Sequence, residues 1–242
     1  MRKYILAIIF FSVLWGGCVA MYNPATQQRE YYFIGESAEV RLGRNMAEKI
    51  RREQELSSDQ SLVRRVRRIG EQVAGVSDRS DIQYHFSVLD DETLNAFALP
   101  GGYIFVHDGL VKKSTDAELA FVLGHEIGHV AARHSLKRLQ AVVGFQLFSA
   151  LAFAEKDHES LRRAVNAVYQ LVALGYSRQD ELSADSLGVE YATAAGFPAQ
   201  GAVSFFRKLQ REANPSPQFE MLQSHPDIET RIRRIQERRG AE

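Results

Sequence analysis

The sequence predicts an α+β fold that is mostly helical, with a small antiparallel sheet beside a helix that carries the pattern H-E-x-x-H. Three observations support this expectation. Apolar residues recur at helical spacing over most of the chain, short segments alternate between apolar and polar residues, and His125-Glu-Ile-Gly-His129 lies in an otherwise apolar helical stretch. The chain has 242 residues, 45% hydrophobic and 25% charged, which is enough for one domain with a sizeable core.

The N-terminus has the features of an export signal. A basic head at residues 2–3 precedes an apolar stretch over residues 4–15 and small residues before Cys18. The segment ending at Cys18 resembles a lipoprotein lipobox, with Trp15 where Leu is usual, so residues 1–18 are expected to be a lipoprotein signal peptide and Cys18 an acylated membrane anchor. The alternative is an uncleaved signal anchor, because the apolar run continues weakly and approaches spanning length. Cys18 is the only cysteine, which excludes disulfides and thiolate chemistry in the rest of the chain.

A linker over residues 19–35 is expected next, followed by one domain over residues 36–242. Periodicity predicts that this domain opens with two amphipathic helices and three short strands. Pro100 lies in a Pro-Gly-Gly turn between the last two strands and favours an edge position, because proline cannot donate to a ladder. The helices cover residues 36–55 and 58–75, and the strands lie within residues 82–89, 95–102 and 103–106.

Helical periodicity resumes after the H-E-x-x-H stretch. An apolar run over residues 141–154 is too short to span a bilayer and predicts a buried helical arm, with a mobile flap or a membrane-facing segment as the alternatives. A long helix over residues 158–192 follows. A last helix over residues 226–239 is expected to bury its isoleucines and to expose four arginines, Arg231, Arg233, Arg234 and Arg238.

The charge pattern gives no sign of a nucleic-acid partner, because the formal net charge is zero. The densest basic cluster is Arg64-Arg-Val-Arg-Arg68, within the second predicted helix. Its arginines alternate with the apolar stripe of that helix, so the cluster predicts a solvated face. A contact with lipid headgroups is the alternative.

The motif His125-Glu-Ile-Gly-His129 has the spacing of a zinc site. Thr115 and Glu118 predict a capping box that starts the helix. Side chains four residues apart lie roughly 40° apart on one helix face, so both imidazoles can bind one zinc ion. Glu126 lies beside the first imidazole, where it can act as general base toward water without taking a coordination position. Burying these polar groups in an apolar helix is unfavourable unless they have partners, and a metal would provide them.

The third ligand of a catalytic zinc is expected on the long downstream helix. Glu181 and Asp185 lie one turn apart on one face of that helix. Glu181 can be the carboxylate ligand, and Asp185 can accept the N–H of a ligating histidine and so set its tautomer. An E-x-x-x-D pair alone is a weak signal, because acidic residues on helices usually face solvent. The upstream H-E-x-x-H motif favours the ligand role.

Four stretches together resemble the HtpX-like zinc metallopeptidases, the family that includes the CAAX prenyl protease. They are Asn95-Ala-Phe-Ala-Leu-Pro-Gly-Gly102, His125 to His129 with Arg133-His134-Ser135, Glu181-Leu-Ser-Ala-Asp185, and Ser224-His-Pro226. The resemblance implies a zincin-like fold and a gluzincin-type site with one zinc ion, three ligands (His125, His129 and Glu181) and Glu126 as general base. It also implies that a substrate adds as an extended strand to an edge strand formed by Asn95, Ala96, Phe97 and Ala98.

His225 is placed close to the zinc by the same resemblance. Two roles are open: His225 could stabilise the oxyanion of the reaction, or it could occupy the fourth coordination position and hold the enzyme inactive. Arg231 could assist at the site by contacting substrate, or it could face water. His134 is expected about 140° round the helix from His129, and therefore not to be a primary ligand.

These features predict a zinc endopeptidase that cleaves unfolded or misassembled cell-envelope proteins. Because the chain lacks the long apolar spans of integral-membrane members, it resembles the lipid-anchored branch of Gram-negative envelopes. The expected location is periplasmic, as an outer-membrane lipoprotein, with an inner-membrane signal anchor as the alternative. One rival function is an assembly chaperone for outer-membrane proteins, with proteolysis latent or secondary. A purely structural zinc site is the other rival, and Glu126 argues against it.

Overall fold

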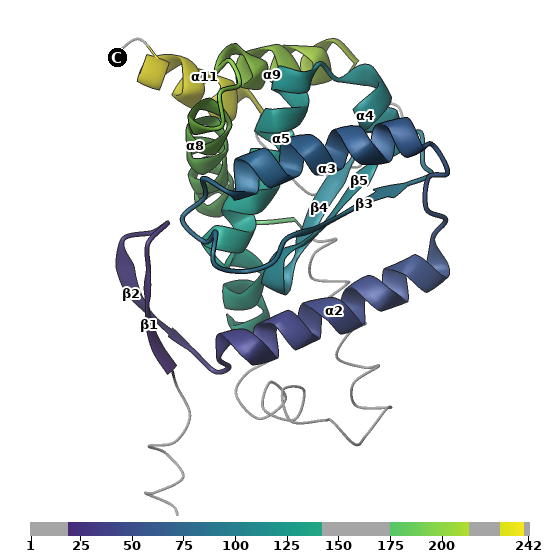
Figure 1. Cartoon of the computed structure of the whole chain (residues 1–242). Coiled ribbons are helices and arrows are strands. Elements are labelled where there is room, and N and C mark those ends of the chain that lie inside the picture. Colours follow the sequence, from purple (N-terminus) through teal and green to yellow (C-terminus); the bar gives the residue numbers. More distant parts are fainter. Residues whose placement is uncertain (1–18, 142–174, 213–227, 240–242) are drawn as a thin grey trace, which may run out of the picture.

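The computed structural model describes residues 19–141, 175–212 and 228–239, in which a small sheet lies between helices (Figure 1). The mostly helical α+β prediction is confirmed. Residues 142–154 of the apolar run and residues 158–174 of the expected long helix lie outside the described residues. The elements in chain order are β1 (Val19–Asn23), β2 (Gln28–Tyr32), α2 (Glu36–Glu53), α3 (Gln60–Ala74), β3 (His85–Leu89), β4 (Ala96–Leu99), the 3-10 turn η1 (Pro100–Gly102), β5 (Tyr103–His107), α4 (Asp108–Lys113), α5 (Asp116–Ala131), α8 (Arg178–Ala194), α9 (Gln200–Glu212) and α11 (Ile228–Arg239).

The central sheet has the strand order β3-β5-β4. β4 pairs antiparallel with β5 across η1, whereas β3 pairs parallel with β5. The sheet is therefore mixed rather than wholly antiparallel, because β5 inserts between the two strands that precede it. β4 lies at one edge of this sheet, which is the position that Pro100, directly after the strand, favours.

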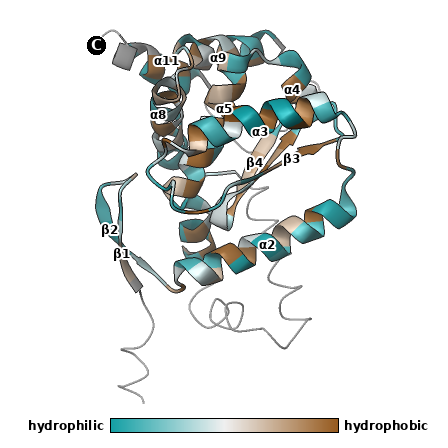
Figure 2. Ribbon diagram, in the orientation of Figure 1, coloured by the Kyte–Doolittle hydropathy of each residue, from teal (hydrophilic) through white to brown (hydrophobic). Residues whose placement is uncertain are grey.

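Side chains alternate between the two faces of the strands, so the core has two layers, one on each face of the sheet. One face of β4 and β5 packs with α3 and α5, and the opposite face packs with α2. Figure 2 shows hydrophobic residues along the strands and mixed hydrophilic and hydrophobic residues along α2 and α3, as expected for amphipathic helices that cover a sheet. The small side chains of Ala96 and Ala98 are on the α5 side and are fully buried, which lets the edge strand lie close to that helix.

Within the stretch 19–35, which the sequence predicts to be a linker, residues 19–32 form a β-hairpin. β1 and β2 pair antiparallel, from Val19 opposite Tyr32 to Asn23 opposite Gln28. Tyr32 is fully buried, with the Arg133 guanidinium 5.2 Å from its ring centroid. The hairpin is therefore packed against the domain through one face.

Helices α5 and α8 approach each other through small residues. An ideal Cβ built on Gly188 would lie 2.8 Å from the backbone nitrogen of His125, and one built on Gly124 would lie 2.7 Å from the carbonyl oxygen of Gly188. Gly128 is less crowded, because a Cβ there would lie 3.1 Å from the Leu187 Cβ and 3.2 Å from the Ala184 carbonyl oxygen. Real Cβ atoms do not come within 3.0 Å of such neighbours, so glycine at positions 124 and 188 is what permits this helix pair to pack so closely.

The N-termini of both helices are capped. Thr115 and Glu118 form the predicted capping box at the start of α5. Ser177 and Asp180 form a second capping box at the start of α8. The helix expected over residues 158–192 thus begins at Arg178 within the described residues, because residues 175–177 are not helical and Ser177 supplies the cap.

A buried ion cluster joins the other end of α5 to α2. Arg79 makes two hydrogen bonds to the Glu39 carboxylate, at 2.7 and 2.8 Å, and one to the carbonyl oxygen of Val130 at 3.2 Å. Arg133 lies 3.2 Å from Glu39 and 3.1 Å from Glu36. Arg79 and Glu39 are 5% and 1% exposed, so these charges compensate one another away from water.

The basic cluster on α3 is only partly a solvated face. Arg65 donates to Asp116 and to the carbonyl oxygens of Val111 and Ser114, and Arg68 donates to Asp116. These contacts tie α3 to the start of α5. Among the residues that the structure describes, no helix is long and apolar enough to cross a membrane.

Candidate metal centre and active site

Three buried side chains from two helices bring their donor atoms together. His125 Nε2 and His129 Nε2, one turn apart on α5, lie 3.0 Å apart. Glu181, in the first turn of α8, places Oε1 3.4 Å from His129 Nε2 and Oε2 3.6 Å from His125 Nε2. All three residues are at most 1% exposed. The close α5–α8 packing produces this geometry.

The donor set fits a zinc ion. Zinc in proteins binds imidazole nitrogen at about 2.0–2.1 Å and carboxylate oxygen at similar distances, so the edge of a tetrahedral site is about 3.3–3.4 Å. The three donor separations of 3.0, 3.4 and 3.6 Å lie on either side of that value. Two imidazoles and one carboxylate are also a typical ligand set of catalytic zinc. Within the described residues, His125, His129 and Glu181 form a group suited to holding a metal ion.

Asp185 lies behind His125 where the sequence predicts it. Its Oδ1 is 2.9 Å from His125 Nδ1, the ring nitrogen turned away from the donor group. Burial alone would raise the pKa of Asp185, but the adjacent Arg231 and His125 outweigh burial and lower it. Asp185 is therefore a buried carboxylate suited to accept the N–H of His125 and leave Nε2 for the metal.

Arg231 is buried, contrary to the expectation that α11 exposes it. It is 3% exposed, and it donates to both Asp185 oxygens at 2.7 and 2.6 Å. Its Nη1 lies 2.9 Å from Glu181 Oε2, and its guanidinium stacks over the ring of Phe206 at 4.8 Å. Although burial would lower the pKa of Arg231, the carboxylates of Asp185, Glu181 and Glu126 raise it. Arg231 is thus a permanent cation beside the donor group.

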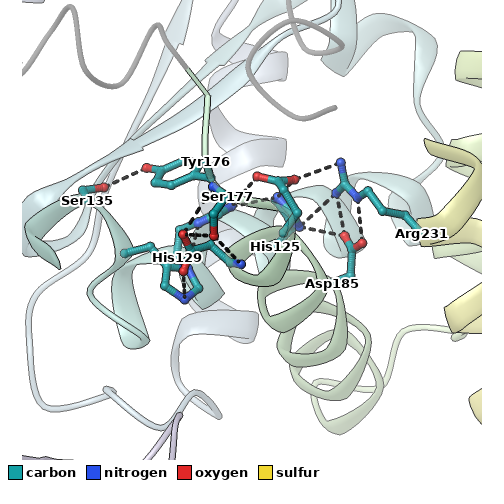
Figure 3. Close-up of polar contacts among 10 residues, drawn as sticks. His125, His129, Ser135, Tyr176, Ser177, Asp185 and Arg231 are labelled. Atoms are coloured by element: carbon teal, nitrogen blue, oxygen red, sulfur yellow. Dashed lines mark hydrogen bonds and ion pairs between the residues drawn. The ribbon is translucent and has the colours of Figure 1, made fainter. Parts of the chain in front are cut away.

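Tyr176 and His134 surround the other imidazole, and neither contact was predicted from the sequence. The Tyr176 ring stacks on His129 with centroids 3.8 Å apart, and its hydroxyl is 2.7 Å from the Ser135 hydroxyl. His134 Nδ1 lies 2.9 Å from His129 Nδ1. Figure 3 shows the two groups, with Tyr176 and Ser135 on the His129 side and Arg231 and Asp185 on the His125 side.

His134 comes close to His129 because α5 does not continue to residue 134. The helix ends at Ala131, and Arg133 adopts a left-handed backbone conformation with φ of 54°. The angle of about 140° expected from a continuous helix therefore does not apply, although His134 remains outside the donor group. Burial, and next the neighbouring His129, lower the pKa of His134 to about 3.

The remaining predicted residues are placed as follows. Glu126 is fully buried on α5, next to the first ligand in sequence. Asn95 precedes β4, and Ala96, Phe97 and Ala98 form most of it. His225 lies outside the described residues, so its expected position near zinc stays a prediction.

Comparison with known proteins agrees with this geometry. A sequence profile described as peptidase family M48 matches residues 60–239, more than half of the chain. The chain belongs to peptidase family M48. It is a zinc metallopeptidase, and the M48 match includes both helices of the donor group and the last helix.

The relatives of this M48 chain include proteins from bacteria and mitochondria. It is 28% identical over 240 residues to the mitochondrial metalloendopeptidase OMA1 of Schizosaccharomyces pombe, covering 95% of this chain and 71% of that protein. It is 29% identical over 204 residues to a putative beta-barrel assembly-enhancing protease of Vibrio cholerae, covering 78% of this chain and 41% of that protein. Metalloprotease LoiP of Escherichia coli is 30% identical over 161 residues, covering 65% of this chain and 64% of LoiP. The chain thus spans less than half of the Vibrio relative.

Proposed function

We propose that this M48 peptidase is an endopeptidase that cleaves unfolded or misassembled proteins of a Gram-negative-type cell envelope. The observation that carries the proposal is the proximity of a buried zinc-binding group on α5 and α8 to an edge strand, β4, that packs on α5. An edge strand accepts any extended backbone, which suits substrates that are recognised by being unfolded. The name of the Vibrio relative, a putative beta-barrel assembly-enhancing protease, supports the envelope context, and the name of the Escherichia relative supports metalloprotease activity.

Each residue of the group has a proposed task. His125, His129 and Glu181 hold the zinc ion, which supplies Lewis acidity that polarises a scissile carbonyl and makes water acidic near neutral pH. Glu126 accepts a proton from the attacking water on a carboxylate oxygen and delivers it to the leaving amine. Asp185 keeps the proton of His125 on Nδ1, and Arg231 keeps Asp185 ionised.

Substrate is proposed to bind as an additional strand beside β4. The predicted substrate-binding strand is Asn95, Ala96, Phe97 and Ala98. The Asn95 carbonyl already accepts from the His107 N–H, so the backbone groups of this stretch that face away from β5 would provide the hydrogen bonds of that pairing. The side chains of Ala96 and Ala98 point into the core, so they keep β4 close to α5 rather than select substrate side chains. The proposal thus predicts weak sequence preference.

Membrane attachment through acylated Cys18 is part of the proposal, with the outer membrane as the expected location. The lipobox-like sequence before Cys18 supports it. Replacing Cys18 by alanine should abolish incorporation of labelled palmitate into the expressed chain, and unchanged labelling would contradict the assignment.

Degradation of casein by the purified full chain tests the peptidase proposal. Cleavage should require zinc and stop with a chelator. Glu126→Gln should bind zinc normally and lose at least about 100-fold in turnover, because the general base is removed. Glu190→Gln, an exposed residue on α8, is the matched control and should cleave like the wild type.

Wild-type turnover in Glu126→Gln would contradict the role of Glu126. If the zinc-loaded wild type binds casein and prevents its aggregation without cleaving it, the peptidase proposal fails and the assembly-chaperone reading replaces it.

A further inference from the structure

The contact between His129 and His134 joins the nitrogen of His129 that faces away from the metal donors to a second, buried imidazole. The two Nδ1 atoms lie 2.9 Å apart, and the rings meet at 74° with centroids 5.0 Å apart. His134 is 3% exposed, so water does not compete freely for this contact. On its other side, His134 Nε2 lies 3.4 Å from Oδ1 of Asp180.

A strained residue holds His134 in this place. Arg133 has φ of 54°, and a non-glycine residue in the left-handed region costs about 1–2 kcal/mol. Arg133 is fixed there by its ion pairs with Glu36 and Glu39 and by its cation–π contact with Tyr32. The domain therefore maintains an unfavourable backbone conformation whose result is to end α5 and turn the next residue onto His129.

The proton positions of this pair follow from metal binding. If His129 gives Nε2 to zinc, its remaining proton is on Nδ1, which must donate to an acceptor. His134 Nδ1 can accept only if the His134 ring is neutral and carries its proton on Nε2, the nitrogen that faces Asp180. The reverse assignment puts the His129 proton on Nε2, where it would block the metal.

We propose that His134, hydrogen-bonded to His129 and facing the Asp180 carboxylate, forms with Asp180 a relay that positions His129 as a zinc ligand and fixes its tautomer. His125 is positioned by a carboxylate, Asp185, whereas His129 is positioned by an imidazole that in turn faces a carboxylate. Asp180 also caps α8 with Ser177, one residue before Glu181. The relay therefore connects a ligand on α5 to the helix turn that carries the third ligand.

The relay rests on the zinc site of the proposed peptidase and not on any substrate. Its first test uses the unaltered, zinc-loaded full chain with ¹⁵N-labelled histidine. The nitrogen spectrum should show His129 protonated on Nδ1 and His134 protonated on Nε2. A proton on Nδ1 of His134 would overturn the proposal.

Substitution gives a second test, in which zinc release to a chelator is measured without substrate. His134→Phe keeps a ring but has no acceptor. It should release zinc about 10- to 100-fold faster, because loss of such a partner usually weakens metal affinity by that factor and the loss should show in the release rate. His134→Asn keeps an acceptor oxygen near the Nδ1 position and should restore most of the retention. His85→Asn, a histidine on β3 away from the site, should release zinc like the wild type.

The thermal midpoint of the metal-free variants separates positioning from folding. The relay requires that His134→Phe and His134→Asn differ in their rates of zinc release while the thermal midpoints of the two metal-free variants are similar. Equal zinc release in both variants, whether fast or at the wild-type rate, would overturn it. If casein cleavage fails while zinc release follows this pattern, the peptidase proposal falls and the relay stands.

Discussion

Gly188→Ala tests whether the close contact of α5 and α8 sets the zinc site. The added Cβ would lie 2.8 Å from the His125 nitrogen and 3.0 Å from its Cα. Both neighbours are backbone atoms, so no side chain can swing away. Contacts between heavy atoms are favourable from about 3.5 Å, so the helices must part by roughly 0.7 Å.

This displacement is large for a metal site. Zinc ligand distances tolerate about 0.2 Å, and Glu181 is on α8 while both histidines are on α5. Overpacking of this kind costs about 1–3 kcal/mol. The metal-free protein can relieve this contact by letting the two helices part, whereas zinc binding requires them to stay close. The cost of overpacking should therefore weaken zinc binding, by about 5- to 150-fold. On helix propensity alone, replacing glycine by alanine in a helix interior would stabilise the helix by about 1 kcal/mol, which is opposite in sign to the expected cost of overpacking.

Zinc affinity measured by competition with a chromogenic chelator is the appropriate assay. Gly124→Ala, whose Cβ would lie 2.7 Å from the Gly188 carbonyl oxygen, should behave in the same way. Gly35→Ala is the control, because a Cβ there meets nothing within 4 Å. Wild-type zinc affinity in folded Gly188→Ala would refute the argument that helix contact sets the donor spacing.

Three further changes have defined outcomes. Glu39→Gln should lower the free energy of unfolding in urea by about 3–5 kcal/mol, because it removes the buried carboxylate closest to Arg79 and leaves only the more exposed Glu36, 3.4 Å away. Glu53→Gln, which removes the exposed partner of Lys49, should change the free energy of unfolding by less than about 1 kcal/mol; equal effects would contradict the assignment. Asp185→Ala should weaken zinc binding about 10- to 100-fold in the same chelator assay, and an unchanged affinity would show that His125 needs no such acceptor. Burial alone would raise the pKa of Glu118, but Lys208 and the Thr115 N–H outweigh burial and lower it. Wild type should therefore exceed Glu118→Gln in stability near neutral pH and lose this advantage as the pH falls through the lowered folded-state pKa, and a stability difference that does not shrink on acidification would contradict this.

Features governed by short-range periodicity were predictable. The capping box at Thr115 and Glu118 and the i,i+4 spacing of the two histidines follow from neighbouring residues, because a helix repeats every 3.6 residues whatever it packs against. Glu181 and Asp185 were identified in the same way, as one face of one helical turn. The strands around the Pro-Gly-Gly turn were also predictable, since both the alternation and the turn are local.

Features that depend on partners distant in the sequence could not be predicted. Nothing near residues 19–35 indicates that Tyr32 will be buried under Arg133, and the parallel pairing of β3 depends on where β5 inserts. Arg231 belongs to an Arg-rich helix, and local composition therefore predicts exposure; only Asp185 and Glu181, close in space but far in sequence, explain its burial.

The sequence by itself determined the chemistry of this protein: two histidines and two carboxylates at helical spacings, which predict a zinc site and its helices. The tertiary structure alone decided how that site is held. Glycines let α5 and α8 approach until three donors surround one point, and the strained Arg133 turns His134 onto His129. The reason is physical. Spacing along a helix is set by the backbone, whereas the distance between two helices is set by the atoms that meet between them.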